Sequence, residues 1–530
     1  MTDLPPWTSD RAAVGPGTVP APAFALEGAA RFGDKPALVD GPTGRTLTYR
    51  QLAHGVERVA AALTARGFGK GDVLALSSPN LPEYALALYG AMTAGGAVTG
   101  ANPLLTAGEL AGQLADADAS LLVTVPPFLE TARAAAEKAG VAEVLVFGEA
   151  DGATPFRDLV AHDHPSARVG IDPARDLAAL PYSSGTTGLP KGVELTHANL
   201  VANARQTQGA VGFTADDVVV GVAPFFHAIG QHLILPCSLR VGATVVTMPR
   251  FDLAAFLALI ERYRATCTVV VPPIMLALAG HPLVDDYDLS SLRWLGCGAA
   301  PLGAAVEQRC ADRLGCVVAQ GFGMTEGAAT FAIAPLDAPR RGSAGRLLGG
   351  TEARIVDPDG GGDLGPGRTG ELWLRGPQVM RGYRNQPEAT ARTIDPDGWL
   401  RTGDLCYMDA DGYLFVVDRL KELIKYKGAQ VAPAELEQLL CAHVAVADAA
   451  VVPRPDLEAG EVPVAYVARR ADVGGDELRA WVAERVAPYK RLRDVRFVDR
   501  VPRSPTGKLL RRALVEAERA AAGRAPVAVL

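Results

Sequence analysis

The chain carries the sequence YSSGTTGLPKG at residues 182–192. An apolar run, Leu177–Leu180, precedes it and a helix-like stretch begins near Thr196, so we expect a strand, a loop and a helix in that order. Glycines let backbone N–H groups approach an anion, hydroxyls add donors, and lysine adds positive charge. This composition predicts a loop that holds a polyphosphate. It is not a Walker A loop, because that motif is GxxxxGK[ST] and here Gly192 follows Lys191.

On both sides of this loop, apolar strand-like runs alternate with longer helix-like stretches rich in Ala and Leu. The clearest examples are Tyr49–Arg66, Val73–Leu76, Leu121–Val125, Leu129–Ala139 and Val144–Phe147. Such alternation predicts the α/β class, with largely parallel and buried strands. The uncharged stretch Val218–Leu239 has the length of a membrane span, but prolines and glycines interrupt it. We therefore expect a buried strand, a break and a buried helix there.

The pattern changes near Gly342, where short alternating strands such as Glu352–Val356 and Glu371–Leu374 are separated by Gly, Pro and Asp turns. This predicts a small antiparallel or barrel-like subdomain. A more charged segment begins near Asp418 and is long enough to form a domain of its own. Its expected elements are a helix at Pro433–Leu440, a strand at Ala447–Val452 and a helix at Asp476–Val486.

Composition excludes several classes of protein. The 530 residues are 48% hydrophobic and 21% charged, which is ordinary for a folded chain and unlike a disordered, collagen-like or coiled-coil sequence. A net charge of −7 argues against a strongly basic nucleic-acid binder. Seven cysteines, without CxxC spacing, argue against a disulfide framework or a zinc cluster and fit a reducing cytoplasm. The N-terminus lacks the cationic start and apolar core of a signal peptide, so we expect a cytoplasmic protein.

Further motifs follow the loop in a fixed order across nearly the whole chain. They are Pro224–His227, Gly298–Leu302, Gln320–Glu326, Gly370–Gly376, Thr402–Asp404, Val417–Gly428, Val431–Glu437 and Pro502–Lys508. Together with residues 182–192 they resemble the signatures of the adenylate-forming superfamily, which includes acyl-CoA synthetases, peptide-synthetase adenylation domains and firefly-type luciferases. The segment 417–437 is especially similar to 4-coumarate–CoA ligases.

This resemblance implies both a fold and a reaction. The fold would be a large N-terminal domain of α/β subdomains ending in a small β-barrel (residues 1–418), followed by a smaller, mobile α+β domain (residues 419–530). In the reaction, a carboxylate attacks the α-phosphate of ATP to give an acyl-AMP and pyrophosphate, and a thiol then displaces AMP. The implied requirements are ATP, Mg²⁺ and coenzyme A as co-substrate. Two anions meet in the first step, so positioning and positive charge must supply most of the catalysis.

The resemblance also assigns residues to the nucleotide. Lys508 would reach the carboxylate and the α-phosphate, and Glu326 would bind Mg²⁺ together with Thr186, since a hard carboxylate suits that cation. Asp404 would accept hydrogen bonds from the ribose hydroxyls, and Arg419 and Gln430 would lie near the ribose and AMP. The remaining ATP or AMP contacts are expected from Ser183, Ser184, Gly185, Thr186, Thr187, Gly188, Lys191, Gln320, Gly321 and Thr325.

The thiol step would use a different set of residues on the C-terminal domain. In the family this domain swings about a hinge, and Asp418 matches the hinge position. Lys425 would be a second catalytic lysine, and Lys427 and Gly428 would line the tunnel for the CoA arm. Arg250 matches a position where related ligases have a basic residue for CoA.

The acid pocket should be flat or narrow, because the matching segments are apolar and contain small residues. Its expected members are His227, Ile229, Gln231, Cys297, Gly298, Ala299, Ala300, Gly321, Phe322, Gly323, Gly327 and Ala328. His227 matches the gate histidine and counts among the catalytic candidates. Coumarate ligases usually have tyrosine two residues after that histidine, whereas this chain has Ile229. We therefore expect an aryl or arylacrylic acid with altered preferences for ring substituents.

Several alternatives remain open at this point. The acceptor could be an acyl carrier protein instead of CoA, and the acid could be a medium- or long-chain fatty acid. Some relatives of the family activate nitrite with ATP to diazotise an aryl amine. A non-catalytic binding module would be expected to lack Lys508 or Glu326, and both are present. The identity of the acid and the oligomeric state do not follow from the sequence, and neither a nucleic-acid nor a membrane partner is expected.

Overall fold

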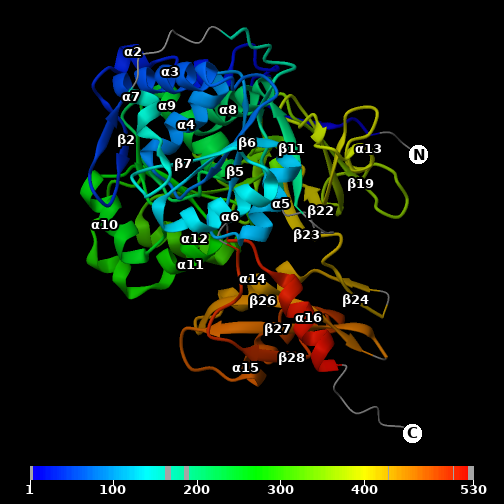
Figure 1. The fold of residues 1–530 in the computed structure, drawn as a ribbon. Coiled ribbons are helices and arrows are strands. Elements are labelled where there is room, and N and C mark those ends of the chain that lie inside the picture. Colours follow the sequence, from blue (N-terminus) through cyan, green and yellow to red (C-terminus); the bar gives the residue numbers. More distant parts are fainter. Residues whose placement is uncertain are drawn as a thin grey trace.

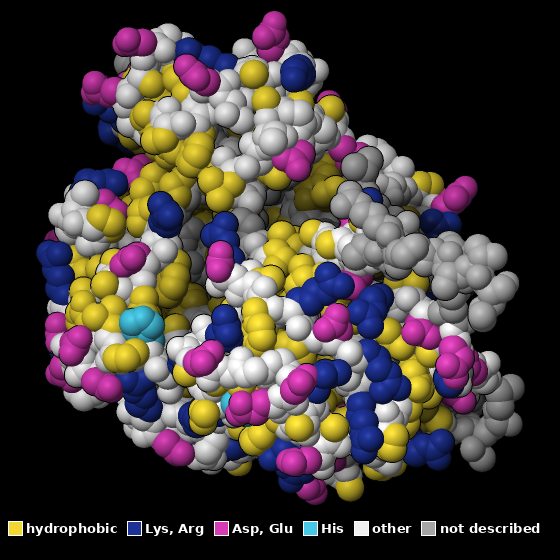
Figure 2. All heavy atoms as spheres, turned by 90° about the horizontal axis from the view of Figure 1, so that it is seen from below, with side chains coloured by type: hydrophobic (Ala, Val, Ile, Leu, Met, Phe, Trp, Pro, Cys, Tyr) yellow, Lys and Arg dark blue, Asp and Glu magenta, His cyan; other side chains and the backbone are white. Residues whose placement is uncertain are grey.

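A computed structural model describes residues 4–161, 169–183, 190–427, 429–456, 458–504 and 507–522. The chain up to strand β23 (Tyr413–Arg419) forms a large body, and the rest forms a smaller body below it in the view of Figure 1. Seen from below, acidic and basic side chains are interspersed, and the surface is hollowed near its middle (Figure 2). Within the described ranges, no helix is long and apolar enough to cross a membrane.

One sheet of the large body is mostly parallel and follows the order β10-β11-β9-β5-β4-β6-β7-β8, with β21 paired to β11. Strand β11 pairs antiparallel with β10, β21 and β9, and the other pairs among the described residues of this sheet are parallel. Its strands are β4 (Val73–Ser77), β5 (Ala97–Ala101), β6 (Ala119–Thr124), β7 (Glu143–Val146), β8 (Thr154–Pro155), β9 (Leu177–Ala179), β10 (Tyr182–Ser183), β11 (Lys191–Thr196) and β21 (Gly382–Tyr383). The strand-like runs of the sequence correspond to β4, β6 and β7, and the α/β class is confirmed.

The second sheet joins a parallel half to an antiparallel half. Its order is β1-β19-β20-β22-β23-β18-β17-β16-β15-β14-β12-β13-β2-β3, and the segment from β16 to β2 is parallel. The parallel half and its edge comprise β2 (Pro36–Asp40), β3 (Thr46–Thr48), β12 (Val218–Gly221), β13 (Thr244–Thr247), β14 (Cys267–Val270), β15 (Trp294–Cys297) and β16 (Val317–Phe322). The antiparallel half comprises β1 (Trp7–Thr8), β17 (Ala332–Ile333), β18 (Gly345–Leu347), β19 (Glu352–Val356), β20 (Gly370–Arg375), β22 (Leu400–Met408) and β23.

The antiparallel half is where the sequence predicts a small barrel. Its strands alternate buried and more exposed residues, as in β20, which fits a sheet with one covered face. They continue the large sheet, however, and no strand pairing among the described residues closes them into a barrel. The subdomain is therefore antiparallel as expected but open in its hydrogen bonding.

Helices cover both sheets, and several begin at clear sequence signals. In α3, α5 and α8, the Ncap threonine and the third helical residue form reciprocal capping boxes. The helices of the large body are α1 (Ala21–Ala25), α2 (Ala29–Phe32), α3 (Tyr49–Ala65), α4 (Pro82–Thr93), α5 (Ala107–Ala117), α6 (Leu129–Ala139), α7 (Arg157–Ala161), α8 (His197–Val211), α9 (Leu235–Val241), α10 (Leu253–Tyr263), α11 (Pro272–Gly280), α12 (Ala304–Leu314) and α13 (Pro387–Thr393). Short turns are η1 (Pro126–Phe128), the π-helical η2 (Ile229–Ile234), η3 (Pro282–Asp286) and η4 (Thr325–Gly327).

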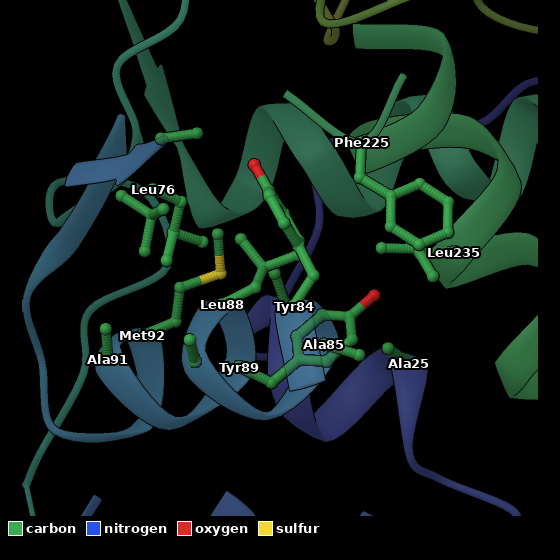
Figure 3. Close-up of a cluster of buried hydrophobic side chains, with 14 of the residues drawn as sticks. Ala25, Leu76, Tyr84, Ala85, Leu88, Tyr89, Ala91, Met92, Phe225 and Leu235 are labelled. Carbon is green, nitrogen blue, oxygen red and sulfur yellow. The ribbon is translucent and has the colours of Figure 1, made fainter. Parts of the chain in front are cut away.

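The main core lies around α4, which is apolar on nearly all sides. Figure 3 shows Tyr84 and Leu88 of this helix among side chains from β4, α1 and the segment around Phe225. The rings of Tyr84 and Phe225 meet edge to face at 5.7 Å. Each such side chain contributes about 1.5–3 kcal/mol when fully buried. The uncharged stretch 218–239 belongs to this core as a strand, a π-helical break and a helix, as predicted.

The smaller body has one sheet, with the order β25-β24-β27-β26 and β28 beside β27. Its elements are β24 (Ile424–Tyr426), β25 (Ala429–Val431), α14 (Pro433–Ala442), β26 (Val446–Asp456), β27 (Gly460–Arg469), α15 (Gly475–Ala483), η5 (Pro488–Lys490), β28 (Asp494–Phe497) and α16 (Arg511–Ala522). It has its own hydrophobic core between the sheet and helices α14 and α15. The domain division at residue 418 stays a prediction.

Candidate active site

A cavity of about 660 Å³ lies at the carboxyl ends of β14, β15 and β16. Ligands of α/β sheets commonly bind at this edge, outside the carboxyl ends of parallel strands. Residues from both bodies line it, including Ser183, Lys191, His227, Gly298, Thr325, Glu326, Tyr383, Arg419 and Lys508. Side chains that the sequence spreads over more than 300 positions therefore meet in one place.

The phosphate loop begins and ends at this cavity. Ser183 on β10 and Lys191 on β11 are paired across a hairpin, and both line the cavity. The Ser183 hydroxyl is buried and has no hydrogen-bond partner among the described residues, so it is available to a ligand oxygen. The predicted contacts Ser184, Gly185, Thr186, Thr187 and Gly188 lie outside the described residues. The loop connects two antiparallel strands, and α8 begins only after β11, which corrects the expected strand–loop–helix order.

Glu326 lies on η4 and is almost fully buried, at 7% exposure. The hydroxyl of Tyr383 donates to its Oε1 at 2.8 Å. The same tyrosine ring faces Lys191, whose Nζ is 4.6 Å from the ring centroid. Pairing of β21 with β11 brings Tyr383 to this position. Tyr383 therefore connects the expected metal ligand to the lysine of the phosphate loop.

The donor set at Glu326 fits Mg²⁺. Within the described residues, no group of three or more His, Cys, Asp or Glu could hold a metal ion by itself. Mg²⁺ usually binds one or two carboxylates and takes its other ligands from water and substrate phosphates. A single buried carboxylate in the cavity that the phosphate loop borders satisfies that requirement.

A cluster of charges surrounds the end of the cavity where Lys508 lies. The Arg419 Nε donates to Oδ1 of Asp404 at 3.0 Å, and Asp404 lies behind Arg419 and does not line the cavity. Burial raises the pKa of Asp404 to about 6, against the opposing effect of Arg419. Burial, together with the Arg419 guanidinium, lowers the pKa of Lys508. Glu326 and Asp404 oppose this shift without reversing it.

A tight turn presents Lys508 to the large body. Ser504 holds it through its backbone and hydroxyl, at 2.8 and 3.2 Å. Gly507 has a φ of +79°, and a β-carbon there would lie 2.8 Å from Cβ of Val271. Only glycine combines this backbone conformation with so close an approach to Val271, which explains why glycine precedes Lys508.

His227 is neutral in this environment. Burial and the positive charge of Lys508 lower its pKa to about 3. Asn80 fixes the chain that leads to it, because its side chain donates to the carbonyls of Gly221 and Ala223 and accepts from the Phe225 N–H at 2.7 Å. An uncharged imidazole can therefore face the carboxylate of an acid without competing with Lys508 for that negative charge.

The structure places some of the predicted acid-pocket residues on the lining of the cavity and others away from it. The predicted residues that line the cavity are His227, Ile229, Cys297, Gly298, Ala299, Gly321, Phe322 and Gly323. Gln231, Ala300, Gly327 and Ala328 do not line it. Gln231 turns away and accepts from Tyr84 at 3.3 Å. Gly327 packs against the Phe331 ring, Ala328 is fully buried, and Ala300 leads into the exposed turn at Pro301.

Two further expectations concern side chains that point away from the cavity. The amide of Gln320 bonds the backbone of Leu302 at 2.9 and 3.0 Å and Glu307 at 2.7 Å, so Gln320 can reach a nucleotide only through its backbone. Cys297 belongs to the hydrophobic cluster that includes Cys310, and burial raises the pKa of its thiol well above the usual range. Its side chain is structural.

The predicted thiol-step residues lie apart from the cavity. Lys425, Lys427 and Gln430 are exposed on the β24–β25 hairpin, and Gly428 lies outside the described residues. Arg250 is exposed and does not line the cavity. Asp418 is buried, and its carboxylate accepts from the backbone N–H of Arg419 and, at 2.9 Å, of Ala434 near the start of α14.

Comparison with known proteins agrees with this geometry. Residues 26–384 match the AMP-binding enzyme family, and residues 435–508 match the AMP-binding enzyme C-terminal domain. The chain belongs to the AMP-binding enzyme family.

Relatives and solved structures within this AMP-binding family cover nearly the whole chain. It is 43% identical over 513 residues to 4-coumarate–CoA ligase 2 of Nicotiana tabacum, covering 94% of each chain. It is 44% identical over 512 residues to 4-coumarate–CoA ligase 5 of Oryza sativa subsp. japonica, again covering 94% of each. The anthranilate CoA ligase AuaEII in complex with anthranoyl-AMP superimposes with a TM-score of 0.89, at 27% identity over 96% of this chain and 98% of that one.

Several lining residues of this AMP-binding enzyme were not predicted from its sequence. Tyr383 is one, because it reaches the site by strand pairing with residues nearly 200 positions earlier, which leaves no local signal. Trp294, Leu233 and Val269 are others. For Trp294 a signal existed, because it precedes Gly298 by four residues in a strand and must share its face.

Proposed function

We propose that this protein activates an aromatic carboxylic acid with ATP and transfers the acyl group to coenzyme A. As a member of the AMP-binding family with 4-coumarate–CoA ligase relatives, it is an AMP-forming acid–CoA ligase that uses ATP and CoA. The observation that carries the choice of an aromatic acid is the lining of the cavity. It combines the charged residues Lys191, Arg419 and Lys508 with glycines and large hydrocarbon side chains such as Trp294 and Phe213.

In the first step, a carboxylate oxygen of the acid bonds to the α-phosphorus of ATP, and the bond from that phosphorus to the bridging oxygen breaks. Pyrophosphate leaves with the bond electrons, and no proton has to move. Lys508 would lie between the two approaching anions and lower their repulsion. Ser183 and Lys191 would hold the outer phosphates, and Asp404, through Arg419, would orient the ribose side.

Glu326 would hold Mg²⁺, which when bound neutralises charge on the phosphates and polarises the reacting phosphoryl group. The contribution of the chain here is to keep that carboxylate fixed by Tyr383 and shielded from bulk water. The neutral His227 would border the acid carboxylate without adding a charge that could draw it away from Lys508.

For the second step, we infer a rotation of the smaller body about Asp418. Lys508 lines the cavity in this structure, whereas Lys425 and Lys427 are exposed and do not line it. Rotation would withdraw Lys508 and bring the β24–β25 hairpin to the cavity, where a CoA thiolate attacks the acyl carbon and AMP leaves.

The unpaired state of all seven cysteines supports the expectation of a reducing, cytoplasmic environment.

The test is pyrophosphate release by the purified full chain with ATP and Mg²⁺ over a panel of cinnamates, benzoates, fatty acids and nitrite. Each acid is assayed with and without CoA, and nitrite also with an aryl amine. We expect an aromatic acid to give the largest kcat/KM and a CoA thioester by mass spectrometry. A preference for fatty acids, acid-dependent release without any thioester, or a signal from nitrite alone would overturn the proposal and indicate a different acid, a carrier-protein acceptor or diazotisation.

Variants separate the two steps. Lys508→Ala should abolish acid-dependent pyrophosphate release and leave thioester formation from supplied acyl-AMP largely intact. Lys138→Ala removes an exposed lysine on α6 and serves as the matched control. Equal loss of both half-reactions in Lys508→Ala would contradict the role proposed for this lysine.

A further inference from the structure

Three neighbouring strands line one part of the cavity, which we call the slot. Val269 of β14, Gly296 of β15 and Ala319 of β16 are in register, and all three line the cavity. Successive side chains on one face of a strand are two residues apart, so Trp294, Gly296 and Gly298 form a row along β15. This row runs from Gly298, at the charged end, through a position without a side chain to the bulky Trp294.

Large hydrocarbon groups close the far end of the slot. The Trp294 ring meets Phe213 edge to face, with centroids 5.4 Å apart. The indole atom nearest to where a β-carbon on Gly296 would be is the carbon Cζ3, at 3.4 Å. This carbon is on the side of the indole opposite its N–H. Val211 and Leu233 complete the far end, and neither has a polar atom in its side chain.

The polar groups of the acid-binding region lie at the other end. His227 is close enough to Lys508 for that charge to lower its pKa. Thr330 lies beside Gly323 at the carboxyl end of β16, because a β-carbon on Gly323 would be 3.0 Å from the Thr330 Cα.

The segment after His227 adds no polar group to the slot. Ile229 faces Gly298, and its Cδ1 lies 3.5 Å from where a β-carbon on Gly298 would be. Gln231, the amide on this segment, bonds Tyr84 instead of facing the slot.

We propose that the acid of this enzyme has an aromatic ring whose end far from the carboxylate carries no hydroxyl or amino group. This inference rests on the proposed function and specifies its substrate class: aryl or arylacrylic acids with an unsubstituted or hydrocarbon-substituted ring. A phenolic hydroxyl at that end would lose its hydrogen bonds to water and find no partner among the described side chains of the far end. Burying a polar group without a partner disfavours binding, whereas a methyl group of similar size gains from burial.

The experiment compares kcat/KM of the full chain for 3-phenylacrylate, its 4-methyl derivative and its 4-hydroxy derivative, measured by pyrophosphate release with CoA present. We expect the 4-hydroxy acid to be worse than the other two by about ten- to a hundredfold. Equal or better use of the 4-hydroxy acid would overturn the inference. So would an equal loss for the 4-methyl acid, because size and not polarity would then set the preference. If no aromatic acid is activated, the proposed function itself fails.

Two variants locate the effect in the slot. Val269→Thr replaces one methyl group with a hydroxyl and keeps the branched shape, so it should improve the 4-hydroxy acid relative to the parent acid by about fivefold or more. Gly296→Ala would place a methyl group 3.1 Å from Cγ2 of Val269 and should lower kcat/KM for aromatic acids about tenfold without changing KM for ATP. A melting temperature close to that of the parent shows that this variant is folded. Unchanged kinetics in both variants would mean that the ring lies elsewhere.

Discussion

The hydrogen bond from Tyr383 to Glu326 offers a sharp test of the site. Burial, together with the charge of Glu326, raises the pKa of Tyr383 far above the assay range, so its hydroxyl keeps its proton and remains a donor. At 2.8 Å it holds one oxygen of a carboxylate that is only 7% exposed. Tyr383→Phe removes this donor and leaves the ring that faces Lys191 in place.

The expected size of the effect follows from the charge on the acceptor. A hydrogen bond to an ionised group contributes about 1.5–3 kcal/mol, roughly twice a neutral one. If the bond serves to orient Glu326 toward the nucleotide-bound cation, its loss should lower kcat/KM for MgATP about ten- to a hundredfold. KM for the acid should change little, because Glu326 lies at the charged end of the cavity.

The assay measures acid-dependent pyrophosphate release while MgATP, free Mg²⁺ and the acid are varied in turn. Tyr49→Phe is the matched control, because it removes a buried hydroxyl that bonds the carbonyl of Ala243 at 2.6 Å, within the core of the large body. Both variants should lose some thermal stability, but only Tyr383→Phe should require more Mg²⁺. Parallel kinetic losses in both variants, or an unchanged Mg²⁺ dependence in Tyr383→Phe, would refute the positioning role.

Three further predictions concern stability and reactivity. Burial raises the pKa of Asp418 from 3.8 to about 6, so the folded chain binds this proton more tightly than the unfolded chain. The folded chain therefore loses stability as pH rises through that range. In urea unfolding, the free energy of unfolding of Asp418→Asn should gain up to about 3 kcal/mol relative to the parent between pH 4 and pH 7. All seven cysteines are unpaired and burial raises their pKa values, so iodoacetamide at pH 8 should alkylate the folded chain slowly, and rapid modification of Cys297 with loss of activity would contradict its structural role. Glu518 on α16 is fully buried and accepts from Tyr466 and Arg496, so Glu518→Ala should destabilise the smaller body by about 1–3 kcal/mol, and an unchanged midpoint would show that α16 is dispensable.

The sequence predicts those parts of the fold whose signals are local. The helix expected at Tyr49–Arg66 is α3, and its start follows from the capping box that begins at Thr48. The antiparallel strands after Gly342 were recognisable from their alternation and turns. The sequence could not predict that these strands stay open instead of closing into a barrel, because closure depends on pairing between edge strands, which alternation alone does not specify.

The candidate site divides in the same way. Lys508, Glu326 and His227 occur in recognisable motifs, and the structure brings them to one cavity. The misplaced residue Gln231 shows a limit of spacing arguments. Gln231 lies four residues after His227, and its backbone N–H donates to the His227 carbonyl at 2.9 Å, as in an α-helix. Its side-chain oxygen nevertheless accepts from Tyr84, a tertiary contact that local spacing does not specify. Tyr383 reaches the site through tertiary strand pairing, which no local pattern encodes.

The charges of the site also bear on how the two steps can follow each other. Lys508 is held next to Arg419 in a buried position, and burial together with the Arg419 charge lowers its pKa. A bound triphosphate would reverse this balance by supplying negative charge to both cations. Loss of pyrophosphate would remove most of that charge and restore the repulsion between Lys508 and Arg419. The charges therefore favour Lys508 in the cavity more strongly while the triphosphate is bound than after pyrophosphate has left, which is the order of events that the proposed rotation about Asp418 needs.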